Sequence, residues 1–297
     1  MKCIYIGDFN ASYSTENYIA DGLIANGVEV IKIREQGLND FQMVINEKPD
    51  FVLFCKGRIL NGVKLLELLK KNNILTVTWL FDLYWDLPKE VPTNRSVNEW
   101  VFKADMVFTS DGGHEEQWKT KGINHFVLRQ GIYSKEAVIG KKQDAPPILF
   151  IGSVTYYARE KLVDYLCFFY KDKFKLIGNP QVRGLALNDL LASTKIVVGD
   201  SVPTPNYWSN RVYEITGRGG FLLHPEVEGL KEEIPDLVTF KYGDFQDLTK
   251  KINYYLNNED EREKIKLDCF NYTKKNLTYE RRCKELLFAI QRRRSVK

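Results

Sequence analysis

The chain has 297 residues, 44% of them hydrophobic, and a formal net charge of +4. The length favours two domains, and no apolar run approaches the roughly 18 residues of a membrane span, which argues against a membrane protein. The five cysteines form no C-x-x-C pair and only three histidines occur, so neither a disulfide framework nor a structural zinc site is expected. Asp8 interrupts the first apolar stretch before it could form a signal peptide, so we expect a cytoplasmic protein.

Short strand-like runs alternate with helical patterns along the first 140 residues. The predicted strands cover residues 3–6, 28–33, 51–54, 74–79, 106–108 and 125–127. The predicted helices between them cover residues 16–26, 63–71 and 115–121. Continuous apolar strands that alternate with helices indicate a parallel sheet with helices on both faces.

A polar segment ending in two prolines, GKKQDAPP at 140–147, then reads as a linker. The alternation restarts with strands predicted at 148–151, 174–177, 196–198, 221–223 and 237–240, and the last fifty residues are helical. The pattern predicts an α/β protein with two Rossmann-like domains, 1–140 and 141–275, facing across a cleft. A basic helix at 276–297 follows them.

The charge is unevenly distributed along the chain. Residues 1–144 hold 18 basic and 19 acidic side chains, whereas residues 274–297 alone hold nine basic and two acidic ones. Such a carboxyl-terminal run fits a solvated helix face, and it also fits a surface for an anionic membrane or nucleic acid.

Several common nucleotide and hydrolase motifs are missing from the sequence. No Walker A motif occurs, no G-x-G-x-x-G follows the first predicted strand, and no G-x-S-x-G elbow is present. These absences argue against a P-loop NTPase, a classical dehydrogenase and an α/β-hydrolase.

The stretch SNRVYEITGRGGFLLH at 209–224 is the most informative in the chain. Ser209 or Asn210 could cap a helix whose amino end attracts a diphosphate. Arg211 in its first turn could clamp that diphosphate, and Glu214 could accept hydrogen bonds from both ribose hydroxyls. The same residues also fit an ordinary surface ion pair on a helix that ends at glycines.

Residues 209–223 resemble the signature of spore-maturation-protein (CgeB)-like glycosyltransferases, which is similar to the motif of group 1 glycosyl transferases. Residues 149–153 with Arg159 and Glu160, residues 176–178 and residues 104–110 resemble further segments of that family. The resemblance implies the GT-B fold and transfer of a hexose or pentose from a nucleotide sugar. It implies no bound metal and no cofactor besides the nucleotide-sugar co-substrate.

The same resemblance assigns residues to the donor. Glu214 would bind the ribose, Arg211 the diphosphate, and Gly152 with Ser153 would let the donor phosphates approach. Arg183 would lie near the base. The first glutamate of the group 1 motif falls at Asn206, which is a departure from that motif.

Acceptor-side candidates follow the strands of the first half. Asp82 follows the strand at 74–79 and Asp8 the strand at 3–6, and either carboxylate could act as a general base. Asp111 and His114 flank two glycines and form a further candidate. Each aspartate equally fits a turn or a helix cap.

These observations predict a metal-independent glycosyltransferase with an unidentified acceptor. Two alternatives remain open: a phage-type enzyme that glycosylates hydroxymethylated DNA bases, and a nucleotide-binding module without turnover.

Overall fold

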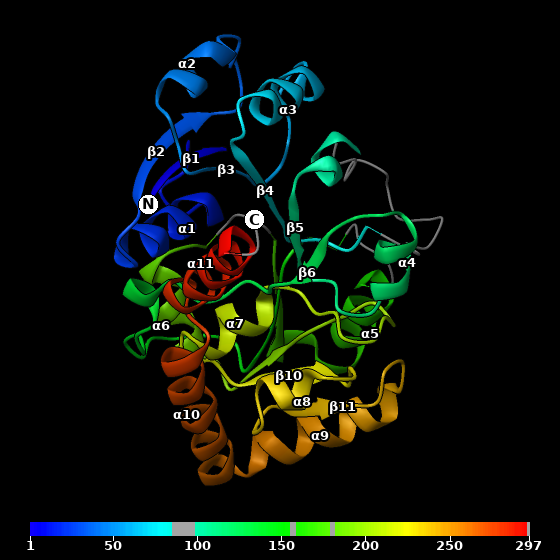
Figure 1. The fold of residues 1–297 in the computed structure, drawn as a ribbon. Coiled ribbons are helices and arrows are strands. Elements are labelled where there is room, and N and C mark those ends of the chain that lie inside the picture. Colours follow the sequence, from blue (N-terminus) through cyan, green and yellow to red (C-terminus); the bar gives the residue numbers. More distant parts are fainter. Residues whose placement is uncertain (85–98, 155–158, 179–181, 296–297) are drawn as a thin grey trace. The chain divides into compact units, whose positions relative to one another are not determined.

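The computed structural model describes residues 1–84, 99–154, 159–178 and 182–295, which form two compact units (Figure 1). Unit 1 contains residues up to 129 together with residues 279–295, and unit 2 contains residues 130–278. The division therefore lies about ten residues before the linker at 140–147. Residues 130–140 join unit 2 through contacts such as the hydrogen bond from the Ile132 amide to the Leu277 carbonyl, at 2.9 Å.

Unit 1 is built on one parallel six-stranded sheet, which confirms the predicted strands. Its strands are β1 (Lys2–Gly7), β2 (Glu29–Arg34), β3 (Phe51–Phe54), β4 (Leu75–Leu80), β5 (Met106–Thr109) and β6 (His125–Val127). The order is β2-β1-β3-β4-β5-β6. The chain moves outward from β1 to β2 and then back past β1 to β3, so the topological switch point lies between β1 and β3.

The helices cover the two faces of this sheet as right-handed crossovers require. The helices of unit 1 are α1 (Thr15–Ala25), α2 (Phe41–Asn46), α3 (Gly62–Lys71), α4 (Glu115–Thr120) and α11 (Tyr279–Ser295), with the 3-10 helix η2 (Glu99–Lys103). α2, which the sequence analysis did not predict, packs with α3 over Ile4, Ile6 and Val52. α11 lies beside α1 (Figure 1), where Gly22 leaves room for Tyr279 and Cys283.

Unit 2 contains a parallel five-stranded sheet. Its strands are β7 (Ile148–Ile151), β8 (Phe174–Ile177), β9 (Ile196–Val198), β10 (Leu222–Pro225) and β11 (Val238–Phe240). Its helices are α5 (Arg159–Tyr170), α6 (Leu185–Ser193), α7 (Arg211–Thr216), α8 (Leu230–Glu233), α9 (Phe245–Asn257) and α10 (Glu259–Asn276), with the 3-10 helices η3 (Ser134–Glu136) and η4 (Lys171–Lys173). The strand order is β11-β10-β9-β7-β8, so the switch point lies between β7 and β9.

Alternate residues of β7 point to opposite faces of this sheet, as the strand period of two requires. Ile148 and Phe150 join a core with α5 and α9, whereas Leu149 joins a core with α6, α7 and α10. Both faces are thus buried, which explains why the strand reads as an unbroken apolar run.

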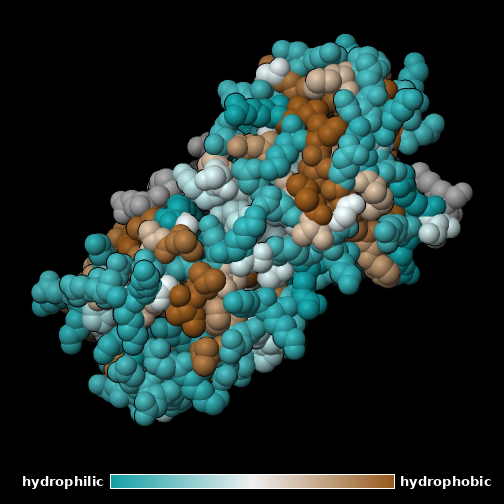
Figure 2. Space-filling model, turned by 90° about the vertical axis from the view of Figure 1, so that its left-hand side faces the viewer, coloured by the Kyte–Doolittle hydropathy of each residue, from teal (hydrophilic) through white to brown (hydrophobic). Residues whose placement is uncertain are grey.

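The face in Figure 2 is mostly hydrophilic, with separate patches of apolar side chains. The exposed large apolar residues are spread over both units and include Ile24, Leu60 and Phe168. Within the described residues, none of the helices combines the length and apolarity that a membrane crossing requires.

Candidate functional site

The candidate site in unit 2 lies at the switch point of its sheet. β7 and β9 are neighbours there, and helices leave their carboxyl ends in opposite directions along the sheet. Gly152 and Ser153 follow β7, and Gly199 and Asp200 follow β9. Ligands of open parallel sheets bind outside the carboxyl ends of the strands at such a point.

Two arginines share one carboxylate at this point. Arg159, the first residue of α5, and Arg211, the first residue of α7, both form ion pairs with Asp200. The three side chains are only 11–12% exposed. Arg159 also donates from Nη1 to the carbonyl oxygen of Ser153 at 3.1 Å, which ties it to the loop after β7. Two positive charges and one negative charge leave a local excess of positive charge.

Arg211 occupies the space that a side chain on residue 152 would fill. Gly152 has a φ of +140°, and a Cβ there would come within 2.5 Å of Arg211 Nη2. The guanidinium lies over the ring of Phe150, with 4.9 Å between Cζ and the ring centroid. Burial, helped by the charge of Arg159, lowers the pKa of Arg211 to about 9, so it remains protonated at neutral pH.

Several buried polar atoms around Arg211 have no hydrogen-bond partner within the described part of the chain. They are Ser209 Oγ, Asn210 Oδ1 and His224 Nε2. Buried polar groups are nearly always hydrogen-bonded in folded proteins, so a cluster of unpartnered ones points to a ligand that completes them.

His224 is a neutral hydrogen-bond acceptor. Its Nδ1 lies 2.7 Å from the carbonyl oxygen of Pro225, which can only accept, so Nδ1 carries the proton. Burial lowers the pKa of His224 to about 4, and the neighbouring Arg211 acts in the same direction. The ring lies against Gly199, where a Cβ would come within 2.7 Å of it.

Glu214 belongs to a second group of charges on α7. Its Oε2 accepts from Arg218 Nε at 2.8 Å and its Oε1 from Asn210 Nδ2 at 3.3 Å. Arg218 is 2% exposed and also pairs with Glu136. Arg211 and Glu214 therefore have different partners: Arg211 pairs with Asp200, and Glu214 pairs with Arg218.

The predicted capping of α7 is wrong. Asn210 occupies the cap position with helical backbone angles and forms no side-chain cap bond, and Ser209 Oγ has no partner within the described residues. α7 is only six residues long, so the charge of the site comes from the arginines rather than from a helix dipole. Arg183 is exposed just before α6, and Asn206 has a left-handed φ of 51° beside Gly229.

The acceptor-side candidates of unit 1 follow three strands of one sheet and so share its carboxyl edge. Asp111, after β5, is fully buried and lies 3.0 Å from His114 Nδ1. It also accepts from the Gly113 amide at 3.0 Å and from Trp118 Nε1 at 3.2 Å. Asp111 and His114 therefore lie in one hydrogen-bonded cluster, and their role on the acceptor side stays a prediction.

Asp8 and Asp82 are only partly buried. Asp8 follows β1, and its Oδ1 accepts from the amide and side-chain nitrogens of Asn10 at 3.2 and 2.9 Å. Asp82 follows β4. β3 lies between β1 and β4, so the structure does not bring these two carboxylates into one hydrogen-bonded pair.

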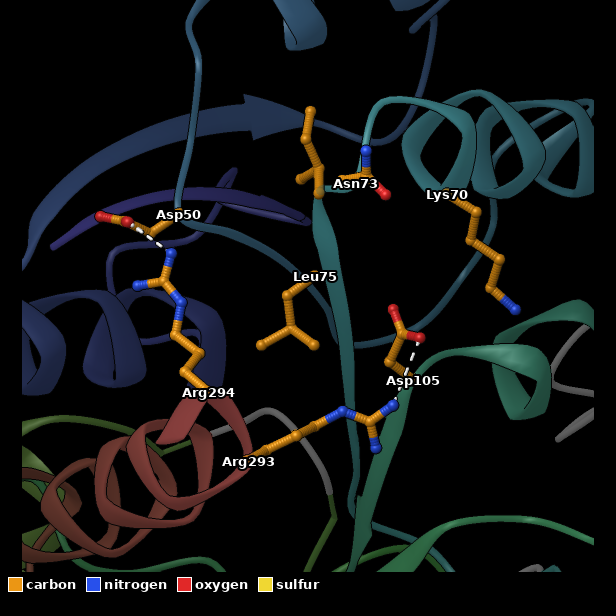
Figure 3. A pocket seen from close by; sticks show the side chains of 8 residues that line it. Asp50, Lys70, Asn73, Leu75, Asp105, Arg293 and Arg294 are labelled. Atoms are coloured by element: carbon orange, nitrogen blue, oxygen red, sulfur yellow. Dashed lines mark hydrogen bonds and ion pairs between the residues drawn. The ribbon is translucent and has the colours of Figure 1, made fainter. Parts of the chain in front are cut away.

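The basic carboxyl terminus is partly neutralised by unit 1. A cavity of about 390 Å³ lies at the amino edge of the sheet, where Asp50 precedes β3 and Asp105 precedes β5 (Figure 3). Arg294 pairs with Asp50 at 2.7 Å and Arg293 with Asp105 at 3.6 Å. These arginines dock α11, which leaves fewer of its charges for a polyanion than the sequence suggested.

Arg159, Asp200 and His224 were not predicted as site residues. Arg159 lies in one of the segments that resemble the family. Asp200 follows a buried strand and a glycine, and this pattern could have indicated a residue at the carboxyl edge of the sheet. No group of three or more His, Cys, Asp or Glu side chains that could hold a metal ion occurs in the described ranges.

Comparisons with known proteins agree with this geometry. A family model described as glycosyl transferase-like matches residues 147–288, which include every residue of the arginine site. Sucrose-phosphate synthase from Thermosynechococcus elongatus is similar with a TM-score of 0.68 and 12% identity, and all of both chains is covered. The fold is GT-B.

Two further GT-B structures are similar over nearly the whole chain. Anabaena HepE, solved in complex with UDP and glucose, has a TM-score of 0.64 and 11% identity, with 98% of this chain and 99% of that chain covered. OtsA has a TM-score of 0.62 and 8% identity, with 97% and 98% covered. No curated protein sequence matches the chain.

Proposed function

We propose that this protein is a glycosyltransferase that binds a nucleotide sugar in unit 2 and transfers the sugar to an acceptor. The observation that carries the proposal is the pair of buried arginines, Arg159 and Arg211, at the switch point of the unit 2 sheet. A diphosphate would supply the negative charge that Asp200 alone does not balance. The match of residues 147–288 to a glycosyl transferase-like family supports the same reading.

The remaining donor contacts follow from the groups around the arginines. Glu214 would accept hydrogen bonds from the ribose hydroxyls, as its carboxylate is only partly used by Arg218. The buried Ser209 hydroxyl could donate to a phosphate oxygen, the buried Asn210 Oδ1 could accept from a sugar hydroxyl, and Arg183 would lie near the base. The signature at 209–223 supports the spore-maturation-protein-like type, with a hexose or pentose as the transferred group.

In the transfer step, a hydroxyl oxygen of the acceptor bonds to the anomeric carbon while the bond from that carbon to the diphosphate breaks. The electron pair of the broken bond leaves with the nucleoside diphosphate, whose charge Arg159 and Arg211 stabilise. The hydroxyl proton passes to a carboxylate, for which Asp8 and Asp82 are the candidates. Because the arginines neutralise the leaving group, we propose that no metal ion is needed.

The test is release of nucleoside diphosphate from a panel of nucleotide sugars. We expect slow hydrolysis of at least one donor by the wild-type protein, and a loss of about 10²-fold or more in Arg211→Gln, since one preorganised charge contact in a transition state contributes that much. Binding without any turnover would favour a nucleotide-binding module instead.

A further inference from the structure

A second cavity in unit 1, of about 320 Å³, lies at the carboxyl ends of β1, β2 and β3. Gly7 and Asp8 line it from the end of β1, Arg34 and Glu35 from the end of β2, and Arg58 from the loop after β3. β1 and β3 flank the switch point of this sheet, which is where an open parallel sheet binds its ligand. The cavity thus has the same topological position in unit 1 as the arginine site has in unit 2.

Glu35 holds the walls of this cavity together. Its amide donates to the Gly7 carbonyl at 3.1 Å, and its Oε2 accepts from the Arg58 amide at 3.0 Å. The residue is 5% exposed, and burial raises the pKa of its carboxyl. Nearby, Lys56 is neutralised by the buried Glu16 at 2.7 Å. Glu35 and Lys56 therefore already have partners within the protein.

The guanidinium groups of Arg34 and Arg58 are not used in this way. Both residues are exposed at the cavity, and neither side chain forms a hydrogen bond or an ion pair with any residue that the structure describes, although the charge of Arg58 also acts on Glu35 and favours its ionised form. Asp8 uses only Oδ1, which accepts from Asn10, and Oδ2 has no partner within the described ranges. The cavity thus presents two open cationic donors beside one open carboxylate oxygen.

We propose that this cavity binds the acceptor and that the acceptor carries an anionic group, a phosphate or a carboxylate, on a hydroxylated skeleton. The inference rests on the proposed function. Arg34 and Arg58 would bind the anionic group through paired N–H donors, for which planar guanidinium groups are suited. Asp8 would accept the hydrogen of a hydroxyl on the same molecule.

The experiment titrates the full-length protein with glucose 6-phosphate, glucuronate and glucose by calorimetry. We expect the charged probes to bind at least tenfold more tightly than glucose, and the stronger of the two identifies phosphate or carboxylate as the anionic group. Arg34→Gln and Arg58→Gln should each lower that affinity about tenfold or more. Lys64→Gln, which removes an exposed charge from α3 outside the cavity, is the matched control and should change nothing.

Equal binding of glucose, or unchanged affinity in both arginine variants, would overturn the inference. UDP, ADP, GDP and TDP are titrated into the same samples. If one of them binds while neither charged probe binds, the acceptor inference fails and the proposed donor site stands. If no nucleoside diphosphate binds but the probes bind through Arg34 and Arg58, the proposed function fails and the anion site remains.

Discussion

The guanidinium of Arg211 lies directly against Gly152, in space that any other residue at position 152 would claim with its Cβ. The glycine after β7 therefore leaves room for the side chain of Arg211. The family resemblance implies that Gly152 lets the donor phosphates approach, and that assignment remains a prediction. The two ideas are compatible, because the arginine held there is the proposed partner of those phosphates.

Gly152→Ala should displace Arg211 and weaken binding of the proposed nucleoside diphosphate about tenfold, which corresponds to about 1.4 kcal/mol. Gly243→Ala is the matched control, since Gly243 also has a positive φ, of 74°, but has open space around its Cβ position. Both variants bear backbone strain, and Gly152→Ala also displaces the ion-paired Arg211, so its unfolding temperature should fall further and affinities are compared at equal folded fraction. If calorimetry gives the two variants equal affinity for the nucleotide, Gly152 does not contribute to the nucleotide site.

Glu214 and Glu136 both pair with the buried Arg218, which allows the ribose contact to be separated from stability. Glu214→Gln and Glu136→Gln should each lower the free energy of unfolding by roughly 1–3 kcal/mol, because a buried charge loses a partner. Only Glu214→Gln should also weaken binding of the proposed nucleoside diphosphate, by about tenfold. A parallel loss of affinity in both variants would mean that Glu214 acts only through Arg218.

The buried imidazole of His224 predicts a pH dependence of stability. Its folded pKa of about 4 is below the usual 6.5, so the unfolded chain binds more protons between these values. The contribution is complete above pH 6.5 and is lost as pH falls towards 4, by roughly 3 kcal/mol in total. His224→Gln should reduce this loss when unfolding by denaturant is followed from pH 7 to 4.5. An unchanged pH profile would count against a neutral buried imidazole.

Nucleic acid is not the acceptor that we expect. Arg293 and Arg294 are paired with aspartates. The basic surface that α11 could still offer to DNA therefore consists of exposed side chains such as Lys284 and Arg292. We therefore predict no salt-sensitive binding of duplex DNA by the full chain, because phosphate contacts provide most non-specific affinity. Micromolar binding at low salt that disappears in Lys284→Glu/Arg292→Glu would reverse this and favour a DNA acceptor.

Charge variants are preferable to truncation for that test. The other face of α11 is buried and includes Tyr279, Cys283 and Leu286. Removing the helix would expose this surface and the facing side of α1, including Gly22, so loss of binding by a truncated chain would report unfolding of unit 1 as well as loss of charge.

The strands and the two Rossmann-like units were predictable because buried parallel strands read as unbroken apolar runs, as Ile148–Ile151 does. The short α2 was missed because six residues carry too little periodicity to show a helical face. The boundary was expected at residue 140 because residues 140–147 read as a polar linker, whereas Ile132 and Gly140 already pack against other residues of unit 2.

The site was only partly predictable, because side chains from distant parts of the chain meet there. The motif at 209–223 identified Arg211, but nothing local to it indicates that Asp200 forms an ion pair with it or that Arg159 shares the same carboxylate. That arrangement depends on β7 and β9 being neighbours, which is a property of strand order rather than of any short motif. The capping prediction failed because the backbone of Asn210 is already helical and its side chain forms no cap hydrogen bond.

The central claim is that Arg159 and Arg211 form a metal-independent site for a nucleoside diphosphate. Its most direct test is calorimetric titration of UDP, ADP, GDP and TDP in the presence of EDTA, with wild type and Arg159→Gln/Arg211→Gln compared at equal folded fraction. The account predicts that at least one nucleotide binds the wild-type protein in EDTA and that the double variant binds it about 100-fold more weakly. Binding that requires added manganese, or that is equally tight in the double variant, would contradict it.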